Sequence, residues 1–116
     1  MNHEDGMNAT CVVRDLKRST WRDQIKTVKL EISEMILSGL KVNWVRPTFD
    51  ENSSFQEVFK NWVDLTIMIA NKRHFLILPC YDVLSTSEEL QEELLSMLLK
   101  AGIVVMVMSG QVMRLL

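Results

Sequence analysis

The fold is decided by residues 73–116, which run RHFLILPCYD VLSTSEELQE ELLSMLLKAG IVVMVMSGQV MRLL. The segment 75–78 is apolar throughout, as in strands that are covered on both faces of a sheet. A polar cluster at 85–87 then precedes 88–100, where leucines recur at helical spacing, and Gly102 ends that pattern. The stretch therefore predicts a strand followed by a helix, with the chain turning back toward the sheet.

A second apolar run, 103–108, completes a strand–helix–strand unit. Ser109 and Gly110 separate it from 111–116. Two turn residues between two β-prone runs predict a hairpin, with a short terminal helix or an extended tail as the alternatives. A strand in that position lies at a sheet edge or pairs with a second copy of the chain, and it exposes apolar side chains.

The first long element is predicted to be a helix over 20–37. Ser19 and Thr20 are both suitable helix caps, and Asp23 follows three residues after Thr20 in an approximation of the capping box. Part of the stretch also alternates as a strand would, but the helical spacing continues beyond that window. One stripe of this helix carries the apolar residues Trp21, Ile25, Val28, Ile32, Met35 and Ile36.

The remaining elements complete a single domain. We expect an edge strand at 11–13, a strand with one solvated face at 40–45, and a helix at 54–70 that is apolar on more than one side. Residues 1–8 are predicted to be a mobile leader to a domain spanning 9–116. The predicted fold class is α+β, with three helices (20–37, 54–70 and 87–100) packed on a mixed sheet of three to five strands.

Composition narrows the class of protein. The chain has 116 residues, 47% hydrophobic and 24% charged, which is typical of one globular domain. Its net charge of −2 gives no electrostatic footprint for nucleic acid. The densest basic stretch is interleaved with acidic residues, which favours a solvated face, with a weak nucleic-acid site on the first helix as the alternative. Its cations are Arg14, Lys17, Arg18, Arg22, Lys26 and Lys29.

The sequence also bears on location. Met1 is followed by polar and acidic residues, so no signal peptide is predicted, and no apolar run approaches the roughly 20 residues of a membrane span. Two cysteines, Cys11 and Cys80, are too few for a disulfide scaffold. We therefore expect an intracellular protein of the cytoplasm or nucleus, with reduced thiols and no membrane span.

Cys80 is the residue that most resembles a catalytic group. With Tyr81 and Asp82, it follows a predicted strand, and ligands of α/β sheets gather beyond the carboxyl ends of strands. His74 lies at the other end of that strand, roughly 13 Å away at about 3.3 Å per residue, so it cannot serve as its base within one chain. A buried structural thiol is the favoured interpretation, and a small enzyme using Cys80 and Asp82 is the alternative. Neither metal-ligand spacing nor a glycine-rich phosphate loop is present, so no metal or cofactor is predicted.

These observations predict a non-enzymatic protein–protein interaction module. Such a module would be a homo-oligomerising subunit, an adaptor, or a small viral or accessory protein, with itself or another protein as its partner. The C-terminal strands and the broad apolar face of the helix at 54–70 would form the contact. The residues expected at this interface are Trp44, Trp62, Val104, Met106, Met108, Val112, Met113 and Leu115.

Overall fold

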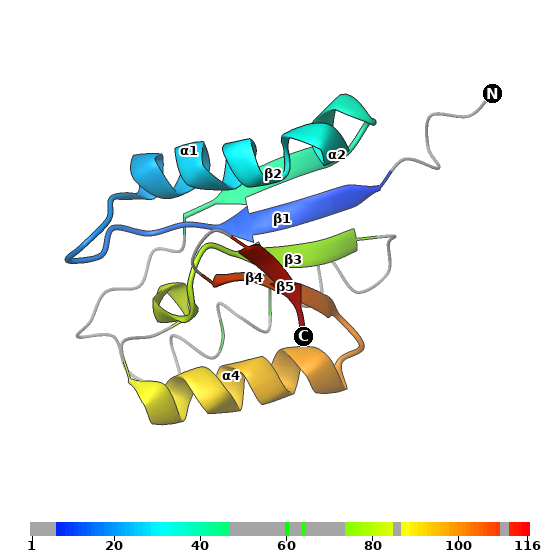
Figure 1. The fold of residues 1–116 in the computed structure, drawn as a ribbon. Helices are drawn as coiled ribbons and strands as arrows, with labels where there is room; N and C mark the ends of the chain where they lie inside the picture. Colours follow the sequence, from blue (N-terminus) through cyan, green and yellow to red (C-terminus); the bar gives the residue numbers. More distant parts are fainter. Residues whose placement is uncertain (1–6, 47–59, 61–63, 65–73, 85–86, 110–111) are drawn as a thin grey trace.

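The computed structural model describes residues 7–46, 60, 64, 74–84, 87–109 and 112–116, on which every structural statement below rests (Figure 1). The predicted helix over 54–70 and its Trp62 lie outside these residues, except for positions 60 and 64, which are helical. Among the described helices, none is long and apolar enough to span a membrane.

Five strands form one sheet in the order β2-β1-β3-β4-β5. The first four are parallel, and the last pairs antiparallel to its neighbour. A mixed sheet within a small domain of helices and strands is therefore confirmed. The strands are β1 (Asn8–Val12), β2 (Lys41–Val45), β3 (His74–Leu78), β4 (Val104–Ser109) and β5 (Val112–Leu115).

The prediction that the segment at 11–13 forms an edge strand is wrong. β1 lies inside the sheet, hydrogen-bonded to β2 on one side and to β3 on the other, and it begins at Asn8. The side chains of residues 9–13 are fully buried. The short apolar run and the charged pair that follows it suggested an edge. A strand that is covered on both faces does not alternate apolar and polar residues, so a short apolar run of this kind is compatible with a central strand.

The helices begin and end largely where the sequence indicates. Thr20 caps α1 (Trp21–Glu31) through the predicted capping box with Asp23, and Ser87 caps α4 (Glu88–Lys100). The single helix predicted over 20–37 is divided, however, because Ile32 leaves helical geometry at φ −104° and ψ 19°. A short helix, α2 (Ser33–Leu37), follows that break.

The two helical layers cover opposite faces of the sheet, as Figure 1 shows with α1 and α2 on one side and α4 on the other. Successive residues of a strand point to opposite faces. Phe75 and Ile77 of β3 accordingly share a core with Val28 of α1, whereas Leu76 packs in the core that contains Leu94 of α4. This double coverage explains why β3 is apolar at consecutive positions.

The connections at the ends of the helices also match the sequence. Gly39 and Gly102 have φ values of +110° and +80°, the left-handed conformation expected of glycine after a helix. At the C-terminus, Ser109 pairs with Val112, so the predicted hairpin is confirmed and the alternatives of a terminal helix or a tail are wrong.

Candidate functional site

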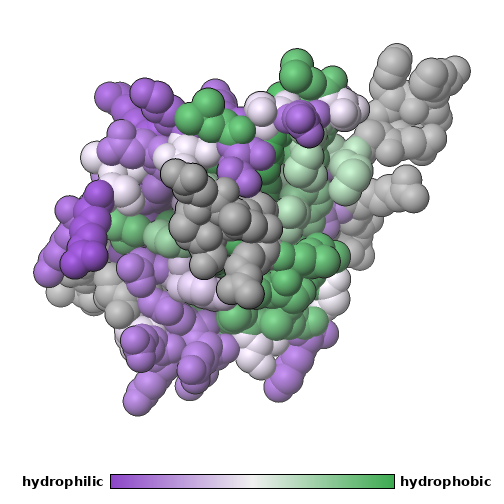
Figure 2. All heavy atoms as spheres, viewed as in Figure 1, coloured by the Kyte–Doolittle hydropathy of each residue, from purple (hydrophilic) through white to green (hydrophobic). Residues whose placement is uncertain are grey.

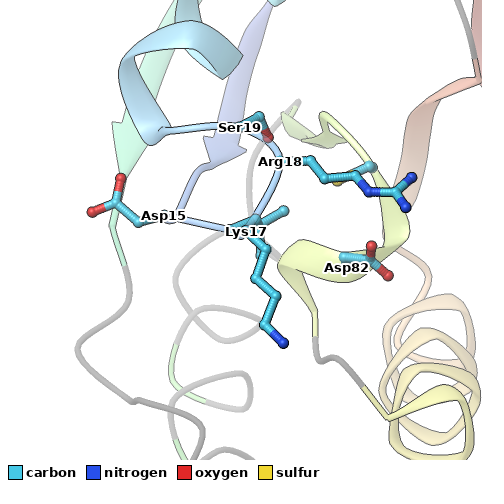
Figure 3. A pocket seen from close by; sticks show the side chains of 7 residues that line it. Asp15, Lys17, Arg18, Ser19 and Asp82 are labelled. Carbon is cyan, nitrogen blue, oxygen red and sulfur yellow. The ribbon is translucent and has the colours of Figure 1, made fainter.

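A cleft opens beyond the carboxyl ends of β1 and β3, the two central parallel strands (Figure 3). The chain leaves β1 toward α1 on one face and leaves β3 toward α4 on the other, so the two connections diverge. Such a divergence is where open α/β sheets bind ligands. The cleft has a volume of about 720 Å³, within the range of small-molecule pockets. The described residues that line it are Asp15, Leu16, Lys17, Arg18, Ser19, Cys80 and Asp82.

Gln24 holds the loop that forms one wall of this cleft. It is 4% exposed, and its side chain accepts a hydrogen bond from the Arg14 amide at 3.1 Å. Its Nε2 donates to the Arg14 carbonyl at 2.7 Å and to Ser19 Oγ at 3.1 Å. One buried amide thus ties both ends of the loop to the first turn of α1. The sequence analysis missed Gln24, although a glutamine between apolar positions of an amphipathic helix is a usable signal.

The carboxylate of Asp15 occupies the start of α1. It accepts a hydrogen bond from the Trp21 amide at 3.0 Å, and its other oxygen lies 3.6 Å from the Arg46 guanidinium. The Thr20 hydroxyl accepts from the amide of Asp23. Because the protein's own oxygens bind these two helical amides, neither amide is available to an anion in the cleft.

Lys17 and Arg18 are the cations of the cleft. Figure 3 shows Arg18 extending from the loop toward the turn that carries Asp82, whereas Lys17 extends in another direction and Asp15 points away from that turn. The ion pair found among the described residues joins Arg46 to Asp15, so neither cleft cation is neutralised within that part of the chain. Asp82 in turn accepts a hydrogen bond from Gln91 Nε2 at 3.1 Å.

The thiol of Cys80 lies partly buried at the floor of the cleft, just before the 3₁₀ turn η2 (Tyr81–Val83). Burial raises its pKa above the ordinary value; hydrogen bonds from the backbone of Asp82 and Val83 oppose the increase, and the Asp82 charge adds to it. His74 is at the far end of β3, where its Nε2 lies 2.7 Å from Thr10 Oγ1. The structure brings Cys80 and Asp82 together, but no described histidine is placed to deprotonate the thiol.

Cys80 should therefore react slowly with iodoacetamide in the folded protein at neutral pH, because the thiolate is the reactive form and a raised pKa depletes it. Asp82→Asn should speed the reaction at a fixed pH, since it removes a negative charge that raises the pKa. Mass spectrometry of the alkylated protein over a pH series measures both rates, and Cys80→Ser identifies the modified residue. Alkylation as fast as that of free cysteine at pH 7 would contradict the prediction and favour a catalytic thiol.

Cys11, by contrast, is fully enclosed in β1, and burial raises its pKa far above the ordinary value. It belongs to the core shared with α1. Among the described residues, no three histidine, cysteine or acidic side chains lie close enough together to hold a metal ion.

No family model, curated protein or solved structure matches this chain. The assignment of function therefore rests on the geometry of its own residues.

The predicted interface residues are spread over both edges of the sheet. Trp44 lies in the edge strand β2 and packs partly against the core beneath α1. Met106 is partly buried in β4, and Met108 is almost fully buried. Val104 and Leu115 are 48% and 67% exposed. Val112 and Met113 belong to β5, where they pair with Ser109 and Met108.

Two cations of α1, Arg22 and Lys29, lie over aromatic rings of the protein itself, as does Arg46 after β2. The Arg22 and Arg46 guanidinium groups lie 5.0 and 4.4 Å from the centre of the Trp21 ring, and Lys29 Nζ lies 5.8 Å from that of Trp44. Cations held over aromatic faces stabilise the fold modestly and cover those rings. The nucleic-acid alternative stays a prediction, and steeply salt-dependent binding would support it.

Proposed function

We propose that this chain is a non-enzymatic interaction module whose partner is a second copy of itself, bound through β5. The observation that carries the proposal is a sheet edge that no other described strand covers, together with exposed leucines at the end of β5 and directly after it. The mode of binding is β-strand addition, in which main-chain hydrogen bonds join two sheets.

The backbone of β5 supports this mode of binding. The Leu116 amide donates to the Val105 carbonyl at 2.9 Å, and Leu115 is opposite Met106. Hydrogen-bonded and non-hydrogen-bonded pairs alternate along an antiparallel ladder. The amide and carbonyl groups of Met113 and Leu115 therefore point away from β4. In the described part of the sheet, no further strand follows β5 to bind them.

Apolar side chains on one face of the sheet at this edge form an apolar corner, defined here as Val104, Met106 and Leu115. Leu115 is 67% exposed and Val104 48%, and Leu116 at the end of the chain is 42% exposed. Figure 2 shows hydrophobic atoms gathered beside the C-terminal end of the chain in the view of Figure 1. Burying these side chains against a second copy would stabilise the dimer by about 25 cal/mol for each Å² of apolar surface removed from water.

The geometry of self-association follows from the strand. Two copies of one strand pair antiparallel about a two-fold axis, and the same residues then meet on both sides. The pairing would extend each sheet into one continuous sheet and bring the two apolar corners together. An interface built on a four-residue strand is small, so we expect a dimer whose population increases with concentration.

Light scattering behind a sizing column, over a concentration series, tests the proposal. The wild-type chain should approach twice its 13.4 kDa mass at high concentration. Met113→Pro should keep it monomeric, because proline removes an amide that points outward and leaves the bonds to β4 intact. Leu115→Lys should act in the same direction by placing like charges across the two-fold axis.

Leu30→Lys is the matched control, since Leu30 is 72% exposed on α1, away from β5. It should leave the mass unchanged, and circular dichroism should show all three variants folded. A wild-type chain that stays monomeric throughout the series, or a folded Met113→Pro variant that still dimerises, would refute pairing through β5.

A further inference from the structure

We propose that the cleft beyond β1 and β3 binds a phosphate monoester of about mononucleotide size, with the phosphate held by Lys17 and Arg18. This site is separate from the edge of β5, and the proposal does not depend on dimerisation.

The cleft lies between the two central strands, where the connection after β1 leads to one face of the sheet and that after β3 to the other. Because the two connections run to opposite faces, they leave a crevice between them, which is where open α/β sheets bind ligands. A volume of about 720 Å³ accommodates a ligand the size of a mononucleotide.

The charges of the described lining residues favour an anion. These residues include two cations and two carboxylates, and because Asp15 is paired with Arg46, the two cations outnumber the one carboxylate that has no ion-pair partner among the described residues. Asp15 binds the Trp21 amide and Arg46, and Asp82 accepts a hydrogen bond from Gln91. Lys17 and Arg18 are exposed, line the cleft and have no ion-pair partner among the described residues.

An arginine and a lysine in one cleft suit phosphate in particular. The guanidinium group offers two parallel N–H donors to two phosphate oxygens, and an ammonium group contributes a compact charge to a third. Because Asp15 and Thr20 already bind the Trp21 and Asp23 amides at the start of α1, the side chains of Lys17 and Arg18 would supply the charged contacts. The uncharged part of the ligand would lie against Leu16 and Cys80, the apolar residues among the described lining, both partly buried against the core beneath α4.

The loop is prepared for this role before any ligand arrives. Gln24 fixes Arg14 and Ser19 at its two ends, and the Leu16 amide donates to the Ser19 carbonyl at 2.8 Å. The backbone that carries Lys17 and Arg18 is thus held in place, so binding orders two side chains rather than a whole loop.

The test is a titration of the ¹⁵N-labelled full chain, followed by NMR, with adenosine monophosphate, adenosine and inorganic phosphate at low salt. Adenosine monophosphate should cause saturable shifts at Leu16, Ser19 and Cys80, whereas adenosine alone should bind far more weakly. The double variant Lys17→Ala/Arg18→Ala should lower the affinity by about tenfold or more, since it removes both charge-assisted contacts. Lys100→Ala, which removes an exposed cation at the end of α4, should bind as the wild type does.

The other ligands identify the chemistry. Inorganic phosphate that binds as tightly as the monoester, and with the same dependence on Lys17 and Arg18, would keep the anion site but remove the mononucleotide part of the proposal. A single-stranded oligonucleotide that binds far more tightly than the monoester would assign the two cations to a nucleic-acid surface and overturn the small-ligand proposal. Absence of saturable shifts at millimolar monoester, or shifts unchanged in the double variant, would also overturn it.

Discussion

Leu94→Ala should lower the free energy of unfolding by about 2–5 kcal/mol, the range for large-to-small changes in a closed core. Leu94 is fully buried on the inward face of α4. It belongs to the cluster that joins this helix to Leu76, Val105 and Val107 of the sheet. Truncation removes three carbons from the contact between α4 and the sheet. Because neither the helix nor the sheet can move far enough to fill the space, a cavity is left, and this cavity adds to the cost.

Urea unfolding followed by circular dichroism measures this loss. Leu99→Ala is the matched control, because it makes the same change on the same helix at a side chain that is 42% exposed. Its cost should be well below that of Leu94→Ala. Equal losses in the two variants would contradict the assignment of Leu94 to the core.

Gln24→Leu should cost roughly 2–4 kcal/mol, although the replacement is apolar and of similar size. The Gln24 side chain bonds to both backbone groups of Arg14 and to Ser19. Leucine offers neither a donor nor an acceptor, and Gln24 is too deeply buried for water to take its place easily. The loss should be concentrated in the loop at 14–19.

Two measurements separate this local effect from a general one. Urea unfolding gives the total cost, and amide hydrogen exchange should show faster opening of 14–19 than of β3 or α4. Gln91→Leu is the control: its amide bonds to Asp82 at an exposed position, so its loss should stay within about 1 kcal/mol. A Gln24→Leu variant as stable as the wild type, with normal exchange in the loop, would show that these hydrogen bonds contribute no net stability.

Leu94 and Gln24 differ in how much of their role the spacing of residues along the sequence can predict. The leucine spacing of 88–100 predicts Leu94 and Leu98 as inward residues, and both are fully buried. Gln24 breaks the apolar stripe of the first helix, and spacing alone says nothing of the partners that satisfy it. Those partners lie five and ten residues away along the chain, on a loop whose path the sequence pattern does not specify.

The candidate site was predictable only in part. The position of Cys80 and Asp82 at the end of a strand follows from the sequence, as does the separation of His74 from the thiol. Lys17 and Arg18 were counted in a basic stretch that was interpreted as a solvated face, and the structure places them in the wall of the cleft, on the loop before α1. Their position depends on β1 being next to β3, a long-range pairing that no local pattern encodes.

The sequence by itself determined the local elements: the capped helices, the glycines that end them, the fully apolar strand at 75–78 and the C-terminal hairpin. These follow from rules that act within about four residues, such as capping, periodicity and turn chemistry. Tertiary structure alone decided that β1 is central, which helices cover which face, and that the cleft lies between β1 and β3. Strand order depends on which apolar faces pack together across the whole chain. The hydrophobic effect is not directional, so it favours one strand order over another only when the helices and the sheet have packed together.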